Sequence, residues 1–271
     1  MPRSRILLRL ALAAGVVGLL AAGCGSEDGG EESSADTTAE ATTTTADTTA
    51  EFCDASETIN LAATAGPDID FETATEEEIG AAFVELLEGL SADFETLTAT
   101  APDEAADDVA AFSEGVDEAI AAEDPSLFED EEFQASADAV FATSTETCEW
   151  TPAAVSGIDY AFEGIPATVA GGLTAITFTN AGDEPHEMVL FAKGEGVTES
   201  FDDLLALPEE EVGDKVVPVG GVSPIEAGDS DTALVDLEPG EYMAICFLPV
   251  GGGDEGPPHF LEGMKSEFTV E

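Results

Sequence analysis

The sequence predicts two folded units of different class, an all-α four-helix bundle over residues 52–150 and an all-β sandwich over residues 155–271. Two observations support this prediction. The first unit has apolar residues at helical spacing, with prolines between the stripes. The second has short alternating, β-branched runs that end at glycine and proline turns. The 271 residues are long enough for two domains after an N-terminal signal and linker.

The N-terminal residues 1–23 have the organisation of a secretory signal peptide. Three arginines precede an apolar run over residues 10–22, which is shorter than the roughly 20 residues of a membrane span. Cys24 directly follows small residues, a pattern that resembles the bacterial lipobox. That resemblance implies cleavage before Cys24 and lipidation of its sulfur, so we expect an extracytoplasmic protein anchored to the cell membrane. An uncleaved helix, or an ordinary signal with a chance cysteine, is the alternative.

Residues 24–51 are predicted to form a disordered acidic linker. They are rich in Thr, Ala and Glu, they contain almost no large apolar side chain, and they have no helical stripe. Such a composition buries too little apolar surface to offset the entropy of ordering. We therefore expect an extended spacer between the membrane and the folded units.

The charge of the chain is strongly one-sided, with 60 acidic residues against 6 basic ones. Such a surface repels nucleic acid and anionic lipid headgroups. Because the acids are spread over every segment, they favour a solvated surface suited to high salt or alkaline pH over a docking surface for a basic partner. No segment has the twelve-residue spacing of an EF-hand, so the signal for calcium binding is weak.

The helical unit is defined by apolar stripes that alternate with Pro67, Pro102 and Pro125. The stripes consist of Ile79, Phe83, Leu86, Leu87, Leu90, Phe94 and Leu97, then of Val109, Phe112, Val116 and Ile120, and then of Phe133, Ala137, Val140 and Phe141. A first short helix is expected to begin near Cys53. Four helices with short connections indicate an antiparallel bundle. The unit contains no His, Lys or Arg, so it offers no base, no nitrogen ligand and no phosphate clamp.

Cys53 and Cys148 stand at the two ends of this helical unit. In an exported protein, cysteines that bracket a unit in this way favour a disulfide, which would stabilise the bundle by about 4 kcal/mol. The alternative is that one of them pairs with Cys246.

The β unit contains several short strands that alternate or are rich in β-branched residues. The expected strands are 167–180, 187–191, 232–237, 241–247 and 265–270. Residues 194–231 form an insertion, in which residues 201–207 are expected to make a short capped helix. This arrangement predicts a β-sandwich.

All the metal-binding chemistry of the chain falls in the β unit. His186 and His259 are its two histidines, and Cys246 is a thiol without an assigned partner. Met264 follows His259 by five positions. Two imidazoles, one thiolate and a weak thioether form the donor set of a blue-copper site.

Three stretches resemble the cupredoxin family: residues 180–186, residues 239–246 and residues 259–264, the last followed by a closing strand. The resemblance covers about residues 165–271 and implies a Greek-key sandwich with one type-1 copper site. The implied ligands are His186, Cys246 and His259 in the trigonal plane and Met264 on the axis. Asn180 would brace the loop that carries the first histidine.

The spacing between Cys246 and His259 departs from that of the family. In familiar electron-transfer members only a few residues separate the cysteine from the second histidine, whereas residues 247–258 intervene here. Pro257 and Pro258 would stiffen the return of this longer loop.

The predicted function is that of a membrane-anchored copper protein that transfers electrons or handles copper, with a redox or copper-donor protein as partner. The alternative is a metal-free cupredoxin-like interaction module of the cell envelope. We expect no enzyme, because a reactive Cys246 would need an electropositive setting that this acidic chain does not offer. The sequence also lacks a phosphate-binding glycine loop, an HExxH pair and a serine elbow.

Overall fold

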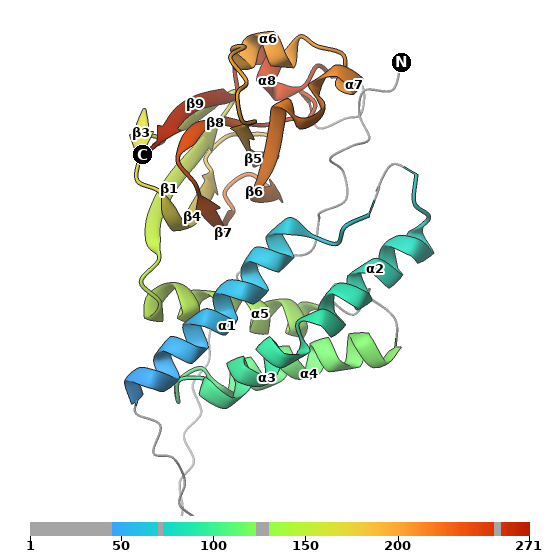
Figure 1. Cartoon of the computed structure of the whole chain (residues 1–271), viewed down its shortest axis with the longest axis vertical. Helices are drawn as coiled ribbons and strands as arrows, with labels where there is room; N and C mark the ends of the chain where they lie inside the picture. Colours follow the sequence, from blue (N-terminus) through green and yellow to red (C-terminus); the bar gives the residue numbers. More distant parts are fainter. Residues whose placement is uncertain (1–44, 70–72, 123–129, 252–255) are drawn as a thin grey trace, which may run out of the picture.

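The computed structural model describes residues 45–69, 73–122, 130–251 and 256–271, which form a helical unit and a β-sandwich packed against each other (Figure 1). The predicted signal peptide and Cys24 lie outside the described residues. Among the helices of the described residues, none combines the length and the apolarity that a membrane span requires.

The described part of the N-terminal unit contains five helices: α1 (Thr45–Ala65), α2 (Glu76–Gly89), α3 (Ser91–Thr100), α4 (Ala106–Ala122) and α5 (Glu131–Thr147). The predicted four-helix bundle is therefore not confirmed. The long stripe from Ile79 to Leu97 is divided, because one helix ends at Gly89 and the next begins after Leu90. Glycine weakens a helix by about 1 kcal/mol relative to alanine, which makes this position a low-cost place for the chain to turn.

Helix α1 begins at Thr45, inside the segment that the sequence predicted to be a disordered linker up to Glu51. Phe52 and Ile59 are buried and fix the helix in the core. Once such a nucleus is held, each further residue adds a hydrogen bond at little entropic cost, so the helix extends in the N-terminal direction without an apolar stripe of its own.

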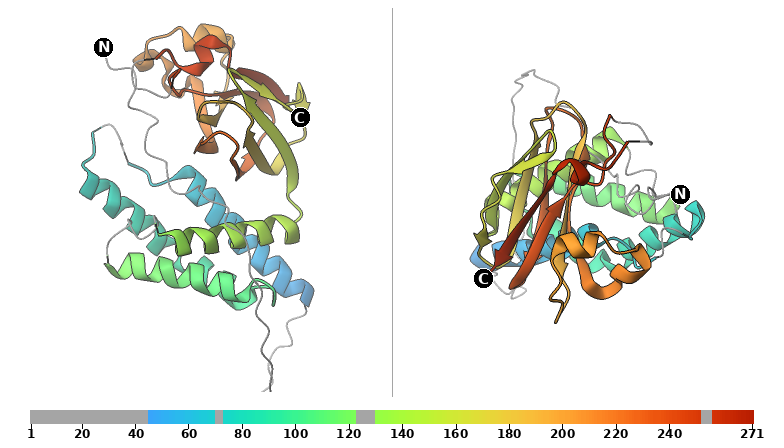
Figure 2. Two further views of the ribbon diagram at one scale, coloured as in Figure 1. Left: turned by 180° about the vertical axis from the view of Figure 1, so that it is seen from behind. Right: turned by 90° about the horizontal axis from the view of Figure 1, so that it is seen from above.

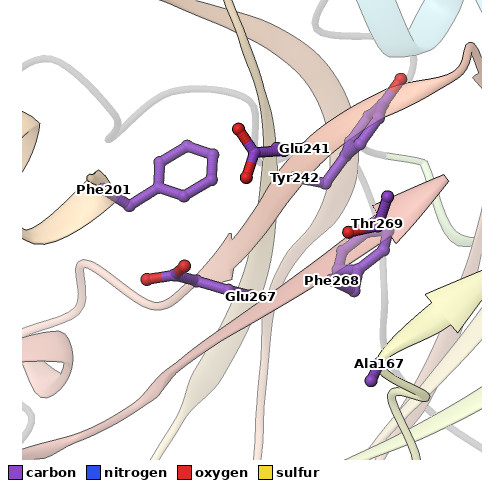
Figure 3. A pocket seen from close by; sticks show the side chains of 7 residues that line it. All are labelled: Ala167, Phe201, Glu241, Tyr242, Glu267, Phe268 and Thr269. Carbon is purple, nitrogen blue, oxygen red and sulfur yellow. The ribbon is translucent and has the colours of Figure 1, made fainter. Parts of the chain in front are cut away.

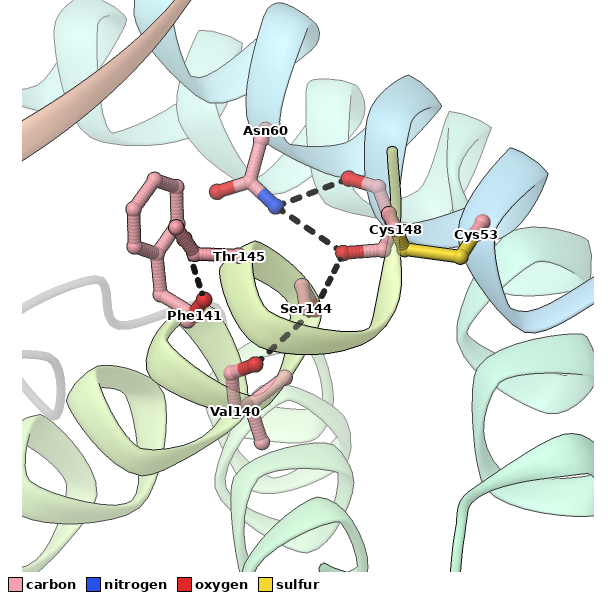
Figure 4. The surroundings of a disulfide bond; sticks show 8 residues. Cys53, Asn60, Val140, Phe141, Ser144, Thr145 and Cys148 are labelled. Carbon is pink, nitrogen blue, oxygen red and sulfur yellow. Dashed lines mark hydrogen bonds between the residues drawn. A yellow bond between two sulfur atoms is a disulfide. The ribbon is translucent and has the colours of Figure 1, made fainter. Parts of the chain in front are cut away.

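The core of the helical unit is closed by a disulfide between α1 and the end of α5. Cys53 bonds to Cys148, as predicted, which excludes the pairing of either with Cys246 (Figure 4). Beside it the hydroxyl of Ser56 donates to that of Ser144 over 2.6 Å, and the amide of Asn60 donates to the carbonyl of Ser56 over 2.8 Å. These buried polar groups are thus paired among themselves.

The β unit is a sandwich of two sheets, which Figure 2 shows from above as two layers. One sheet has the order β2 (Ala161–Glu163), β1 (Thr151–Ile158), β4 (Gly172–Asn180), β7 (Ser230–Leu237). The other has the order β3 (Thr168–Val169), β9 (Lys265–Val270), β8 (Gly240–Ile245), β5 (His186–Lys193), β6 (Val216–Ile225). Strands β1 and β4 are parallel, as are β3 and β9, and the other pairs are antiparallel. Phe178 and Val235 from the first sheet and Leu190 and Ala244 from the second are buried between the layers.

Strand β6 is the main element of the sandwich that the sequence analysis missed. It lies in the predicted insertion and contains Pro218, Gly220 and Gly221, residues that weaken a strand assignment. Strand β6 is the edge of its sheet and pairs only with β5 in the described structure, so a proline is tolerated there. Strands β1 and β2 were also not among the predicted strands, and β1 begins at Thr151, before the predicted start of the β unit at residue 155.

The rest of the insertion covers the outer face of the second sheet. Helix α6 (Phe201–Leu205), confirmed where a short helix was predicted, is followed by α7 (Glu209–Val212) and the short 3-10 turn η2 (Gly213–Lys215). Phe201 and Leu204 are buried against Met243 and Ile245 of β8. A pocket of about 120 Å³ is lined by Phe201 and by the side chains of Glu241 and Glu267 (Figure 3). Its lining contains no imidazole or thiol.

Helix α1 joins the two units by packing against β7 and β6. The hydroxyl of Thr64 donates to the carbonyl of Leu234 over 3.4 Å. The side chains of Leu234 and Ala175 are buried in the helical core. At Gly220, whose φ is 127°, an added Cβ would lie 2.3 Å from Thr64, so this close approach requires glycine.

Candidate metal centre

Four positions in three segments bring the predicted metal ligands together at one end of the sandwich. His186 opens β5, Cys246 directly follows β8, His259 opens the one-turn helix α8 (His259–Glu262), and Met264 immediately precedes β9. None of the four residues is more than 1% exposed. The centre is therefore closed to bulk water.

The two imidazoles and the thiol are within ligating distance of a common point. The Nδ1 atoms of His186 and His259 are 3.1 Å apart, and Sγ of Cys246 lies 3.4 Å from Nδ1 of His259. One ligand atom from each of the three residues lies within 4.8 Å of the others. Zinc, copper and iron accept such donors, and the combination of two imidazoles with one thiolate is that of a blue-copper centre.

Met264 is fixed between the segments that carry the other ligands. Its backbone amide donates to the carbonyl of His259 over 3.1 Å, and its carbonyl accepts from the amide of Cys246 over 3.2 Å. Its methyl group lies over Gly157 of β1, where an added Cβ would be 3.1 Å from Cε. The backbone of Met264 is therefore tied to that of His259 and Cys246, and its side chain is buried in the core of the sandwich.

The two ends of the unusually long loop after Cys246 are held together by backbone hydrogen bonds. The amide of His259 donates to the carbonyl of Leu248 over 2.8 Å, and that of Phe260 donates to Cys246 over 3.0 Å. A further bond joins Val250 to the carbonyl of Pro257 over 2.9 Å. The loop thus leaves and returns as a paired hairpin stem, and His259 reaches Cys246 despite the spacing between them.

Asn180 braces the loop before His186, the role that the resemblance implied. Its amide nitrogen donates to the carbonyls of Glu184, over 2.8 Å, and Ile225, over 3.0 Å. Its oxygen accepts from the amide of Gly182 over 3.0 Å. An added Cβ at Gly182 would lie 2.6 Å from Nε2 of His186, so only glycine lets this loop pass so close to the ring.

Burial sets the protonation of the thiol and of the first imidazole. Burial raises the pKa of Cys246 to about 12, so without a metal this thiol stays neutral and unreactive at neutral pH. Burial, and after it the neighbouring His259, lowers the pKa of His186. A bound cation reverses the preference of the thiol, because metal binding displaces its proton.

Three residues that the sequence analysis did not single out surround the histidines. Oε2 of Glu184 lies 3.2 Å from Nε2 of His259, and Oδ1 of Asp159 lies 3.5 Å from Nε2 of His186. Tyr160 packs edge-on against His259 with ring centroids 5.1 Å apart. Their contacts join residues far apart in the sequence, so no local pattern could have indicated them.

A buried carboxyl group, that of Glu187, lies next to the centre. Glu187 is 3% exposed and accepts a hydrogen bond from the amide of Phe247 over 2.9 Å. Burial raises the pKa of Glu187 to about 7. Glu187 lies between His186 and Met188, where the register between β5 and β6 shifts.

Comparisons with known proteins give similarities to solved structures over less than half of this chain. Neither the protein-family models nor the curated proteins contain a match to this sequence. Among solved structures, a dithionite-reduced auracyanin from Roseiflexus castenholzii is similar, with 23% identity over 45% of this chain and 97% of that chain and a TM-score of 0.32. Auracyanin A of Chloroflexus aurantiacus, a "blue" copper protein, has 17% identity over 45% and 98% of the two chains and a TM-score of 0.28. Rusticyanin from Thiobacillus ferrooxidans has 14% identity over 44% and 76%, with a TM-score of 0.29.

These similarities cover less than half of this chain, and the identities are all below 25%. The assignment of the metal site therefore depends on this chain's own residues. The buried group of His186, Cys246 and His259, together with Met264, fits one type-1 copper site.

Proposed function

We propose that this chain is a membrane-anchored extracytoplasmic protein whose cupredoxin-like domain binds one copper ion and transfers single electrons or handles copper. One observation carries the proposal: two imidazole nitrogens and a thiol converge within 4.8 Å in a fully buried site. Soft sulfur together with imidazole suits copper, and it disfavours magnesium and calcium, which prefer oxygen ligands.

The protein's contribution is to hold the ligands rigidly and to exclude water. Bound copper would supply one-electron redox chemistry. Strand β5, the end of β8 and helix α8 each place one ligand, and the backbone bonds between Met264, Cys246 and His259 tie these segments together. A ligand set that is already assembled leaves little to rearrange between two oxidation states.

In this proposal, the N-terminal segment determines where the protein is located, and the net charge limits which partners it can bind. The lipobox-like sequence before Cys24 supports a lipid anchor, and a linker separates it from the folded units. The strong negative charge disfavours nucleic acid as a partner, and the proposed partner is a redox or copper-donor protein. The buried, neutral thiol supports a carrier over a thiol enzyme.

A copper titration of the full-length chain in detergent tests the proposal. We expect a strong visible thiolate-to-copper band at one copper per chain, and we expect Cys246→Ser to abolish it. Met243→Leu is the matched control, because Met243 is also buried on β8 but faces the cluster beneath α6. A folded protein without the band would refute copper binding and would favour a metal-free interaction module of the cell envelope.

A further inference from the structure

The outer nitrogens of the two imidazoles both face carboxylates. Nε2 of His259 is 3.2 Å from Oε2 of Glu184, while Nε2 of His186 is 3.5 Å from Oδ1 of Asp159 and has no hydrogen-bond partner among the described residues. Both rings therefore turn Nδ1 toward each other and Nε2 toward a negative charge, and Nδ1 of His259 also lies next to the thiol of Cys246. His259 has the shorter and better-paired of the two contacts.

Glu184 joins three segments around the site. Its Oε2 accepts not only from His259 but also from the amide of Gly251, over 2.7 Å, in the long loop. Its Oε1 accepts from the hydroxyl of Tyr160 over 3.3 Å, and its backbone carbonyl accepts from Asn180 over 2.8 Å. One side chain thus connects the turn between β1 and β2, the loop before β5 and the loop after Cys246.

Tyr160 has an unusual backbone conformation that serves the same contact. Its φ is 63°, and it is the one non-glycine residue with positive φ in the described structure. Such a conformation is uncommon for a bulky residue and persists where the surroundings enforce it. Here it places the phenol ring against the imidazole of His259 and its hydroxyl on Glu184.

We propose that Glu184, supported by Tyr160, is a positioning residue that fixes the ring of His259 with its proton on Nε2 and lowers the reduction potential of copper bound at this site. The first part concerns the metal-free protein, and the second rests on the proposed function.

The tautomer follows from the contact itself. A carboxylate accepts hydrogen bonds, so the imidazole nitrogen that faces Glu184 carries the proton and Nδ1 keeps its lone pair for a metal. The Nδ1 atoms of His186 and His259 are 3.1 Å apart, and a shared cation relieves the repulsion that two lone pairs would have at this distance.

The effect on the potential follows from charge. A carboxylate on the outer nitrogen makes the imidazole a stronger donor, and a fixed negative charge favours the more highly charged oxidised copper over the reduced ion. Removal of this charge is therefore expected to raise the potential. Glu184 is only 27% exposed, so water screens its charge incompletely.

The matched variants are Glu184→Gln, Glu184→Ala and Asp183→Asn. Glutamine keeps an oxygen for His259 and Gly251 but loses the charge, whereas alanine loses both. Asp183 is an exposed neighbour in the same loop whose side chain has no described contact with either imidazole, so Asp183→Asn tests a nearby charge without the bond. Circular dichroism identifies any variant that fails to fold. If Glu184→Ala does not fold, the nearly isosteric Glu184→Gln variant still tests the positioning role and the effect on the reduction potential.

The positioning part is measured on the full chain without copper, by NMR of its two histidines at pH 8. We expect a single Nε2–H tautomer of His259 in the wild type and in Glu184→Gln, and a mixture in Glu184→Ala. The amide of Gly251 should exchange at least tenfold faster in Glu184→Ala, because it loses a charge-assisted hydrogen bond. Unchanged tautomers and exchange in Glu184→Ala would overturn the positioning role.

The second part is measured by redox titration of the copper-loaded protein. The potential should rise in Glu184→Gln and Glu184→Ala by clearly more than in Asp183→Asn. Equal shifts of the reduction potential in Glu184→Gln and Asp183→Asn would show that Glu184 acts only as one of many surface charges, and they would overturn this part. If the wild type binds no copper, the proposed function fails, while the NMR result still decides the positioning role.

Discussion

Removing the disulfide should destabilise the helical unit selectively. The bond between Cys53 and Cys148 closes a loop with a sequence separation of 95. On the chain-entropy model a loop of this length restricts the unfolded chain by about 4.7 kcal/mol. The double variant Cys53→Ala/Cys148→Ala should therefore lose about 4 to 5 kcal/mol of unfolding free energy, and its unfolding should depend more steeply on urea because its unfolded state is more expanded.

The chain contains its own reporter for this experiment. Trp150 is its single tryptophan, is 8% exposed, and packs against Phe141 of α5 with ring centroids 6.0 Å apart. The only tyrosines, Tyr160 and Tyr242, are in the sandwich. Urea unfolding followed by tryptophan fluorescence therefore reports on the helical unit, and the copper band reports on the sandwich.

The wild type treated with a reductant separates the crosslink from the lost side chains. Reduction should reproduce most of the loss seen in the double variant, and the sandwich transition should move much less than the tryptophan transition. A loss below about 1 kcal/mol in both samples would show that the bond does not restrict the unfolded chain as the loop-closure argument requires.

Three further predictions concern other parts of the chain. Burial, with the nearby charge of Asp138, raises the pKa of Asp231 in the folded protein. The contribution of Asp231 to the free energy of unfolding is therefore complete at pH values below its ordinary pKa, and it is lost as the pH rises through the raised pKa of the folded state. Urea unfolding between pH 4 and 8 should show this loss of stability in the wild type, and Asp231→Asn should remove it. If the stability of the wild type and of Asp231→Asn depended on pH in the same way, Asp231 would not be the group responsible. Met264→Leu should keep the visible band but raise the potential, because a weak donor to oxidised copper is lost, whereas Met243→Leu should leave both unchanged. Cys24→Ala should move the protein from the membrane fraction to the soluble fraction, and continued membrane retention would argue against the lipid anchor.

The ligand set could be predicted from the sequence because its residue types are scarce. With two histidines and one unassigned thiol in the β unit, few combinations were possible, and the stretches around them resemble those of the cupredoxin family. The structure brings His186, Cys246 and His259 together, as that resemblance implied. The small number of histidines and free cysteines, more than any single motif, made this part of the site predictable.

The parts that were missed depend on contacts across the fold. Strand β6 reads as a loop because of its glycines and proline, and only its edge position beside β5 makes the assignment possible. Glu184 stands inside a stretch already singled out for His186, yet its partner is His259, 75 positions away. Among so many acidic residues, nothing local distinguishes the two carboxylates that face the imidazoles.

The metal centre and the helical unit lie at different ends of the described structure (Figure 1). Helix α1 runs from Thr45 to its contact with the sandwich near Thr64, and α8 lies at the end of the sandwich away from the helices (Figure 1). A helix of 21 residues spans about 30 Å at 1.5 Å per residue. The first described residue of this helix, Thr45, is thus at the end of the helix away from the sandwich. A protein that contacts the end of the sandwich near α8 would therefore not have to displace the helical unit (Figure 1).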